Sequence, residues 1–149
     1  MGGLLPNSQK SNKDEFMKTV EKLIGASQCR GSAQVFIIGS MISVLVPPLL
    51  MIWIAASIFA YASVAHHPDM RVREYQRWAG YRFYGLVGTL VVVLNFSGAM
   101  QDWVGGGMNL LLTVWALSIL VIVPLGVRDL VRIRRENWQD ILVEVQVHE

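Results

Sequence analysis

Three long apolar runs separate polar stretches along the chain. The first run, residues 35–64, has no ionisable side chain, and the second, residues 83–100, is interrupted by Asn95 and Ser97. The third run covers residues 108–127. A helix needs about 20 consecutive apolar residues to cross a bilayer. The pattern therefore predicts an all-α integral membrane protein with three apolar helical segments, which together form a membrane domain over residues 35–127.

The first run is too long for one upright helix and too short for two full spans. Pro47 and Pro48 lie near its middle, and proline inside a helix removes a backbone donor and produces a kink. Either the run is one tilted, kinked span, or it is a hairpin that enters and leaves on the same side. A turn at the prolines would leave backbone carbonyls unpaired in hydrocarbon, which is costly. The sequence therefore favours the kinked span, which places the N-terminus outside.

Residues 1–34 form a polar segment ahead of the membrane domain. Ser11 and Asp14 fit a capping box. Apolar residues then follow at helical spacing, namely Phe16, Met17, Val20, Leu23 and Ile24. This pattern predicts a short amphipathic helix that stops at Gly25 and lies on the membrane surface, on a partner, or against its own chain.

The basic residues are distributed unevenly over the loops. The connector at residues 66–82 has four Arg, the C-terminal segment at residues 128–149 has four more, and the turn at residues 101–107 has none. Short loops rich in Lys and Arg stay in the cytoplasm. The last two runs are therefore expected to form a hairpin whose turn faces outward. The C-terminal tail would then be cytoplasmic, and the membrane would be the plasma (inner) membrane of a bacterium.

Local patterns add detail to both polar segments. In the connector, Asp69 can cap a short helix. In the tail, apolar residues alternate with polar ones from Ile141 onward, which predicts a short strand.

The membrane runs offer residues for contact between helices. Small residues at helical spacing let two helix backbones approach closely, and an asparagine in a span can form an interhelical hydrogen bond. The candidates for helix packing are Ala56, Ala60, Gly85, Gly88 and Asn95. The candidates for lipid headgroups are Arg128, Arg132, Arg134 and Arg135. Such a basic cluster attracts anionic lipid or serves only as a topology signal.

Several kinds of chemistry find no support in the sequence. No ionisable residue lies deep in an apolar run, which argues against an autonomous ion carrier. His66 and His67 are adjacent, so their side chains point to different sides and do not form a facing haem pair. The single cysteine, Cys29, excludes an internal disulfide and a cysteine-based zinc site. We therefore expect no enzyme activity, no cofactor, no metal site and no nucleic-acid binding.

These observations lead to three hypotheses about function. The first is a small non-enzymatic subunit of a larger membrane assembly, such as a secretion or conjugation apparatus or an energy-converting complex. Its partners would be the lipid bilayer and other membrane subunits or further copies of itself. The second is a stand-alone inner-membrane immunity or exclusion protein that binds and blocks a partner. The third is an accessory subunit that helps to hold the cofactor of a membrane enzyme.

Overall fold

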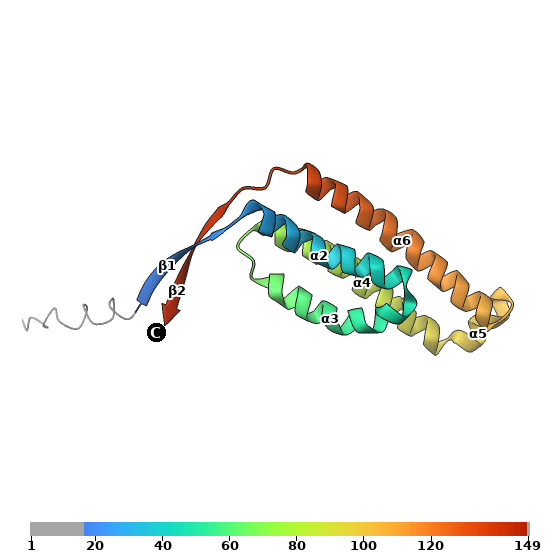
Figure 1. Cartoon of the computed structure of the whole chain (residues 1–149). Coiled ribbons are helices and arrows are strands. Elements are labelled where there is room, and N and C mark those ends of the chain that lie inside the picture. Colours follow the sequence, from blue (N-terminus) through green and yellow to red (C-terminus); the bar gives the residue numbers. More distant parts are fainter. Residues whose placement is uncertain (1–16, 149) are drawn as a thin grey trace, which may run out of the picture.

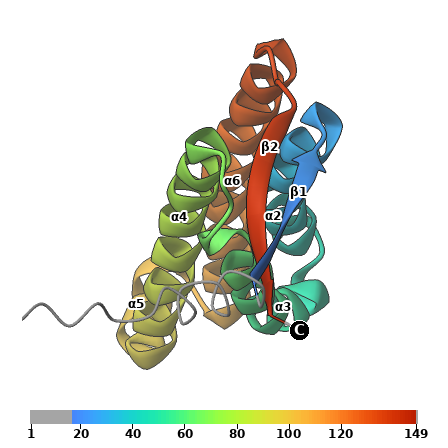
Figure 2. The ribbon, with the colours of Figure 1, turned by 90° about the vertical axis from the view of Figure 1, so that its left-hand side faces the viewer.

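The computed structural model of the protein describes residues 17–148, which form five helices and a two-stranded ribbon. Along the chain the elements are β1 (Met17–Ile24), α2 (Ala26–Leu45), α3 (Pro47–Ala65), α4 (Met70–Asn95), α5 (Ser97–Val104), α6 (Gly107–Arg135) and β2 (Ile141–His148). The four long helices pack into a bundle, with the ribbon projecting from one end and α5 at the other (Figure 1). Figure 2, viewed from the ribbon end, shows both strands in front of the helices.

Length and apolar composition identify the elements that could cross a membrane. Helices α3 and α6 each meet this test alone. Helices α4 and α5 meet it only as a pair, and the pair is bent by 87° at its break. The expected all-α fold is therefore confirmed, with two or three helical segments that could cross a membrane.

The first apolar run is a pair of helices that fold back on one another. Trp53 Nε1 in α3 donates a hydrogen bond to Ser40 Oγ in α2 at 3.1 Å. The rings of Phe36 and Tyr61 lie with centroids 6.3 Å apart. In one continuous helix these two residues would be about 37 Å apart, at roughly 1.5 Å per residue. The kinked single span predicted from the sequence is wrong, because the run folds back on itself as in the alternative hairpin.

The two prolines start a helix instead of kinking one. Pro47 and Pro48 occupy the first positions of α3, where a missing amide is not needed for an intrahelical bond. The backbone carbonyl groups at the turn also find donors. The backbone N–H of Val46 donates to Ile42 O at 3.0 Å, and Trp115 Nε1 in α6 donates to Val44 O at 3.0 Å. Val44 O, one of the carbonyls that argued against the hairpin, is thus supplied with a donor from another helix.

A strand, β1, replaces the amphipathic helix predicted near residues 16–24. Strand β1 pairs antiparallel with β2, from Met17 opposite His148 to Ile24 opposite Ile141. The predicted strand in the tail is therefore present, and its open edge draws the N-terminal segment out of its local helical preference. Because the two strands pair, both lie at the same end of the bundle, which contradicts the prediction of opposite sides for the two termini. The proposed capping box lies outside the described residues.

The connector and the second apolar run belong to one helix. Asp69 caps α4 as predicted, since its Oδ1 accepts a hydrogen bond from the Arg71 N–H at 2.8 Å. The helix is not short, however, because it continues for 26 residues into the apolar run. Helix α6 likewise continues past the third run to Arg135. The turn between them contains α5 and two glycines with positive φ, Gly105 at 80° and Gly106 at 124°.

The hydrophobic core lies in the half of the bundle nearer the ribbon. The ring of Phe36 in α2 is at its centre and is almost fully buried. Aromatic rings from α3 and α4 surround it at centroid distances of 5.9 to 6.3 Å, namely Trp53, Tyr61, Phe83 and Tyr84. Tight packing at this level fixes α4 against the hairpin and so positions the polar residues described next.

Candidate functional site

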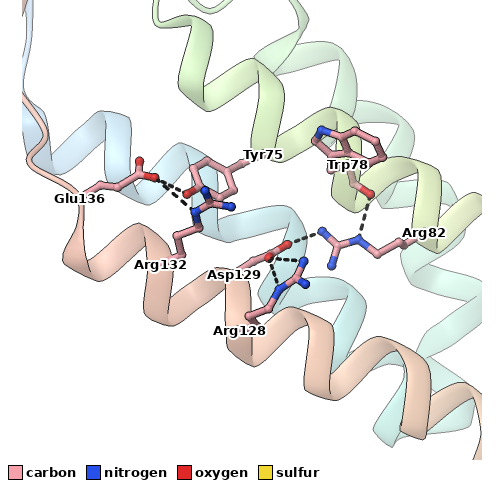
Figure 3. A network of polar contacts seen from close by, with 7 residues as sticks. All are labelled: Tyr75, Trp78, Arg82, Arg128, Asp129, Arg132 and Glu136. Atoms are coloured by element: carbon pink, nitrogen blue, oxygen red, sulfur yellow. Dashed lines mark hydrogen bonds and ion pairs between the residues drawn. The ribbon is translucent and has the colours of Figure 1, made fainter.

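Polar side chains meet between α4 and α6, where both helices change from apolar to charged (Figure 3). On α4, Arg82 is the last charged residue before the apolar run that begins at Phe83. On α6, the third run ends at Val127, directly before Arg128. Arg82 Nη2 donates to Asp129 Oδ2, so the two changes lie side by side. The contact therefore marks one common boundary across the two helices.

Asp129 is the most deeply buried charged group at this boundary, with only 4% of its surface exposed. Its Oδ2 accepts from Arg82, while its Oδ1 accepts from Arg128 Nε and Nη2 at 3.3 Å each. Arg82 Nε also donates to Trp78 O at 3.1 Å. A buried carboxylate needs such partners, and Asp129 in turn holds two guanidinium groups from different helices close together.

A second polar contact ties the end of α6 to α4. The Tyr75 hydroxyl donates to Glu136 Oε1 at 2.5 Å. Arg132 Nε lies 4.0 Å from the same oxygen. The other oxygen, Glu136 Oε2, is buried and has no hydrogen-bond partner among the described residues. Glu136 is the C-cap of α6, so this contact fixes where the helix ends relative to α4.

These contacts line a cleft of about 470 Å³ between α4 and α6. Its walls carry four arginines, three carboxylates, two aromatic rings and one leucine, namely Arg71, Glu74, Tyr75, Trp78, Arg82, Leu125, Arg128, Asp129, Arg132 and Glu136. Guanidinium groups recognise phosphate and carboxylate oxygens through paired N–H donors. The arrangement is suited to binding an anion, because it gathers four arginine side chains around one cleft.

The structure divides the four arginines proposed for lipid headgroups. Arg128 and Arg132 line the cleft, whereas Arg134 and Arg135 are exposed and do not. The cleft instead includes Arg71 and Arg82 of α4, which the sequence analysis did not single out. A signal was present for Arg82, since it ends the charged connector just as Arg128 begins the charged tail.

The structure also divides the candidates for helix packing. Ala56 and Ala60 are half-buried in α3, and Ala60 packs against the core. Gly85, Gly88 and Asn95 are exposed on α4. Apart from nearby helix backbone and chain neighbours, no heavy atom lies within 4 Å of a Cβ added at Gly85 or Gly88. Asn95 Nδ2 donates to Val91 O of its own helix at 2.8 Å, and so makes no interhelical bond within the chain.

The histidines and the cysteine take local or structural positions. His67 Nδ1 accepts a hydrogen bond from the Asp69 N–H at 3.2 Å. Among residues 17–148, no three His, Cys, Asp or Glu side chains come close enough to hold a metal ion. Burial raises the pKa of the Cys29 thiol, and the Asp69 carboxylate raises it further. The thiol is thus protonated at neutral pH and is a poor nucleophile.

The polar boundary and the open face of α4 are therefore the two features from which a function can be argued. One gathers arginines around a cleft, and the other exposes small residues on a membrane helix. No protein family, no curated protein and no solved structure matches the chain.

Proposed function

We propose that the protein is a small non-enzymatic membrane subunit that works by helix contact within a larger membrane assembly. The observation that carries the proposal is the α4 contact face, defined here as Gly85, Gly88, Thr89, Val92 and Asn95. All five side chains or Cα positions are exposed. With about 3.6 residues per turn, they share one side of α4. Among the described residues, no other element covers this face, so we propose that it takes a partner helix.

The chemistry of this face suits close approach by another helix. Thr89 Oγ1 donates to Gly85 O at 2.9 Å, and Asn95 donates within its own helix as well. One donor of each polar side chain is thus already bonded within α4, and the two glycines add no bulk. Lipid tails are as apolar as most side chains, so membrane helices associate through close packing, which small residues permit. A partner with small residues on its own helix would fit this face.

The proposed membrane placement follows the arginines. Helix α6 and the apolar part of α4 would cross as a hairpin, with α5 on the outer side. The α2–α3 hairpin would enter from the cytoplasm and return to it, so that the ribbon and both described chain ends lie inside. All four arginines of the connector and all four of the tail are then cytoplasmic. A bacterial inner membrane is the proposed location.

Chemical labelling tests this placement. With Cys29 replaced by Ala, we expect a cysteine at the exposed Asp102 to react with an impermeant thiol reagent in intact cells. A cysteine at Arg134 should react only after the membrane is opened. A cysteine at Lys22, in β1, should behave like the one at Arg134, because β1 and the tail are paired. Labelling of Lys22→Cys together with Asp102→Cys from outside would contradict the same-side hairpin.

Purification in mild detergent tests the assembly. The wild-type chain should elute with other membrane proteins at fixed stoichiometry. The double variant Gly85→Leu, Gly88→Leu should insert normally, since both positions are open, but lose these partners. The matched control is Leu94→Phe, which enlarges an exposed position about 180° from Gly85 and about 120° from Gly88 on the same helix. The control should keep the partners.

The same experiment separates the competing hypotheses. A wild-type chain that purifies alone or as a homodimer favours the immunity or exclusion protein. A Soret absorption band in the purified sample favours the cofactor accessory. Equal loss of partners in the glycine variant and its control would show that the α4 contact face is not where the partners bind.

A further inference from the structure

The cleft between α4 and α6 points to a ligand that the helix-contact proposal does not include. We propose that it binds the phosphate group of one anionic membrane lipid at the bilayer surface. Arg82, Arg128 and Arg132 would supply the donors, and Asp129 would be a positioning residue that holds Arg82 and Arg128 together. The inference needs the membrane placement but not the partner assembly.

The first support is that several guanidinium N–H groups in the cleft have no hydrogen-bond partner among the described residues. Each arginine has five N–H groups. Arg82 uses Nε and Nη2, and Arg128 uses Nε and Nη2, so in both the Nη1 group has no hydrogen-bond partner among the described residues. Arg132 approaches only Glu136, at 4.0 Å. Figure 3 shows the guanidinium groups of Arg82 and Arg128 meeting at Asp129 from opposite helices.

The second support is the net charge at the boundary. Two guanidinium groups around one carboxylate leave one positive charge at Asp129. The Arg132 charge lies one helical turn further along α6 and is matched by Glu136, whose Oε1 is also held by Tyr75. Asp129 and Glu136 Oε1 are therefore both engaged, and the other two charged residues of the lining, Arg71 and Glu74, are opposite in sign. The four arginines and three carboxylates of the cleft thus leave one surplus positive charge, which we place where Arg82 meets Arg128. One phosphate diester, with a single negative charge, balances that surplus.

The third support is the position of the cleft along α6. It reaches from Leu125, inside the apolar run, to Glu136 at the helix end. This span of 11 residues is about 16 Å at roughly 1.5 Å per residue. It is long enough for acyl chains to begin beside Leu125 and a headgroup to lie among the charges. Trp78, which is exposed beside the arginines, belongs to the residue types that prefer the headgroup region.

A soluble phosphate compound shares the recognition chemistry but not this geometry. A free phosphate would need only the arginines, whereas a lipid also uses the apolar end of the cleft. The lining ends at Arg82 on α4 and at Leu125 on α6, where both helices become apolar, so the lipid is the source that we favour.

Native mass spectrometry of the intact protein in detergent tests the proposal. The protein is titrated with dioleoyl phosphatidylglycerol and, separately, with dioleoyl phosphatidylcholine. Wild type should retain one phosphatidylglycerol molecule in preference to phosphatidylcholine. The variant Arg128→Gln, Arg132→Gln should bind phosphatidylglycerol about tenfold more weakly. Both side chains are largely exposed, at 67% and 71%, so the fold should tolerate the change.

The matched control removes the same charge from the same helix end. In Arg134→Gln, Arg135→Gln the cleft is intact, and phosphatidylglycerol binding should stay within about twofold of wild type, since only diffuse surface charge is lost. Equal weakening in both variants would overturn the proposal in favour of diffuse surface charge. Equal retention of the two lipids would overturn the anionic headgroup. Complete displacement by an equimolar amount of soluble glycerol 3-phosphate would overturn the lipid as the source.

Discussion

The two ends of the bundle are held together in different ways. At the ribbon end, polar contacts join elements far apart in the chain, including Arg82 with Asp129 and Tyr75 with Glu136. The Ala26 N–H also donates to Asp140 Oδ1 at 2.7 Å, 114 residues away. Beyond the contact of Trp115 with Val44 O, toward α5, the described side-chain hydrogen bonds are local, as when Asn109 Nδ2 donates to Val104 O at 3.1 Å.

The apolar side chains differ in the same way. Near the ribbon, Phe36, Phe83 and Ile133 are almost fully buried. Near α5, large apolar side chains are exposed on every helix that reaches this end, among them Leu94, Phe96, Trp103, Met108 and Leu111. Water penalises such exposure, but lipid and partner helices do not. The chain thus stabilises its own charged end, whereas the apolar side chains at the other end are left for lipid or partner helices to cover.

The largest effect should come from breaking the boundary ion pair. Arg82→Met removes one partner of a buried carboxylate, and we expect a loss of about 3 kcal/mol in the free energy of unfolding in detergent micelles. The double variant Arg82→Met, Asp129→Leu should recover much of the loss, because no buried charge is then left without its partner. Exposed Arg134→Met is the control. Equal melting of Arg82→Met and Arg134→Met would show that the pair adds no stability.

Two glycines, one tightly packed and one in open space, should respond oppositely to substitution by alanine. A Cβ at Gly39 would clash with the Trp53 ring, which is itself hydrogen-bonded to Ser40. Gly39→Ala should therefore cost about 1–3 kcal/mol through overpacking of the hairpin. Gly88→Ala adds its methyl group to open space and should leave the melting temperature of the isolated protein unchanged or slightly raised. Destabilisation by both would mean that the two sites are equally packed.

Tyr75→Phe should have a smaller effect at the ribbon end. The change removes the donor to Glu136 Oε1, while Oε2 already lacks a partner. Leaving a buried carboxylate in this state should cost about 1–2 kcal/mol. Amide hydrogen exchange should accelerate in the last turn of α6, near Arg135, and not in α5. Uniform acceleration over the whole chain would argue against a local role for this contact.

The smallest effect should follow a change at the α5 end. Asn95 is exposed and bonds only to its own helix, so Asn95→Ala should change the unfolding free energy of the isolated chain by less than about 0.5 kcal/mol. Thermal melting of the purified monomer measures this. A loss comparable to that of Tyr75→Phe would show that Asn95 already has a partner within the chain.

The sequence predicts the structure correctly where a short stretch of neighbouring residues determines it. The apolar runs predicted the helices, and the Asp69 cap was confirmed in position. The positions of the arginines also indicated the polar boundary between α4 and α6. Arg82 directly precedes the second apolar run and Arg128 directly follows the third, and these two runs were expected to form an antiparallel hairpin. Their common partner, Asp129, follows Arg128 directly, but nothing in the local pattern indicates which arginine of α4 it would meet.

The sequence-based predictions were wrong where a residue distant in the chain determines the local structure. The hairpin at the prolines depends on a donor from Trp115, 71 residues beyond Val44. Strand β1 depends on the edge offered by β2 at the far end of the chain. In both cases a local preference, for a continuous helix or for an amphipathic one, lost to a tertiary hydrogen bond that the sequence pattern does not reveal.

The ribbon also has a consequence for biosynthesis. Ile24 pairs with Ile141, so β1 is made well before its partner strand. At translation rates of about 5–20 residues per second, the wait is on the order of ten seconds. During that time every described helix is synthesised while β1 has no partner strand. The ribbon forms last, and it can form only once α6 has returned the chain to the end of the bundle where β1 lies.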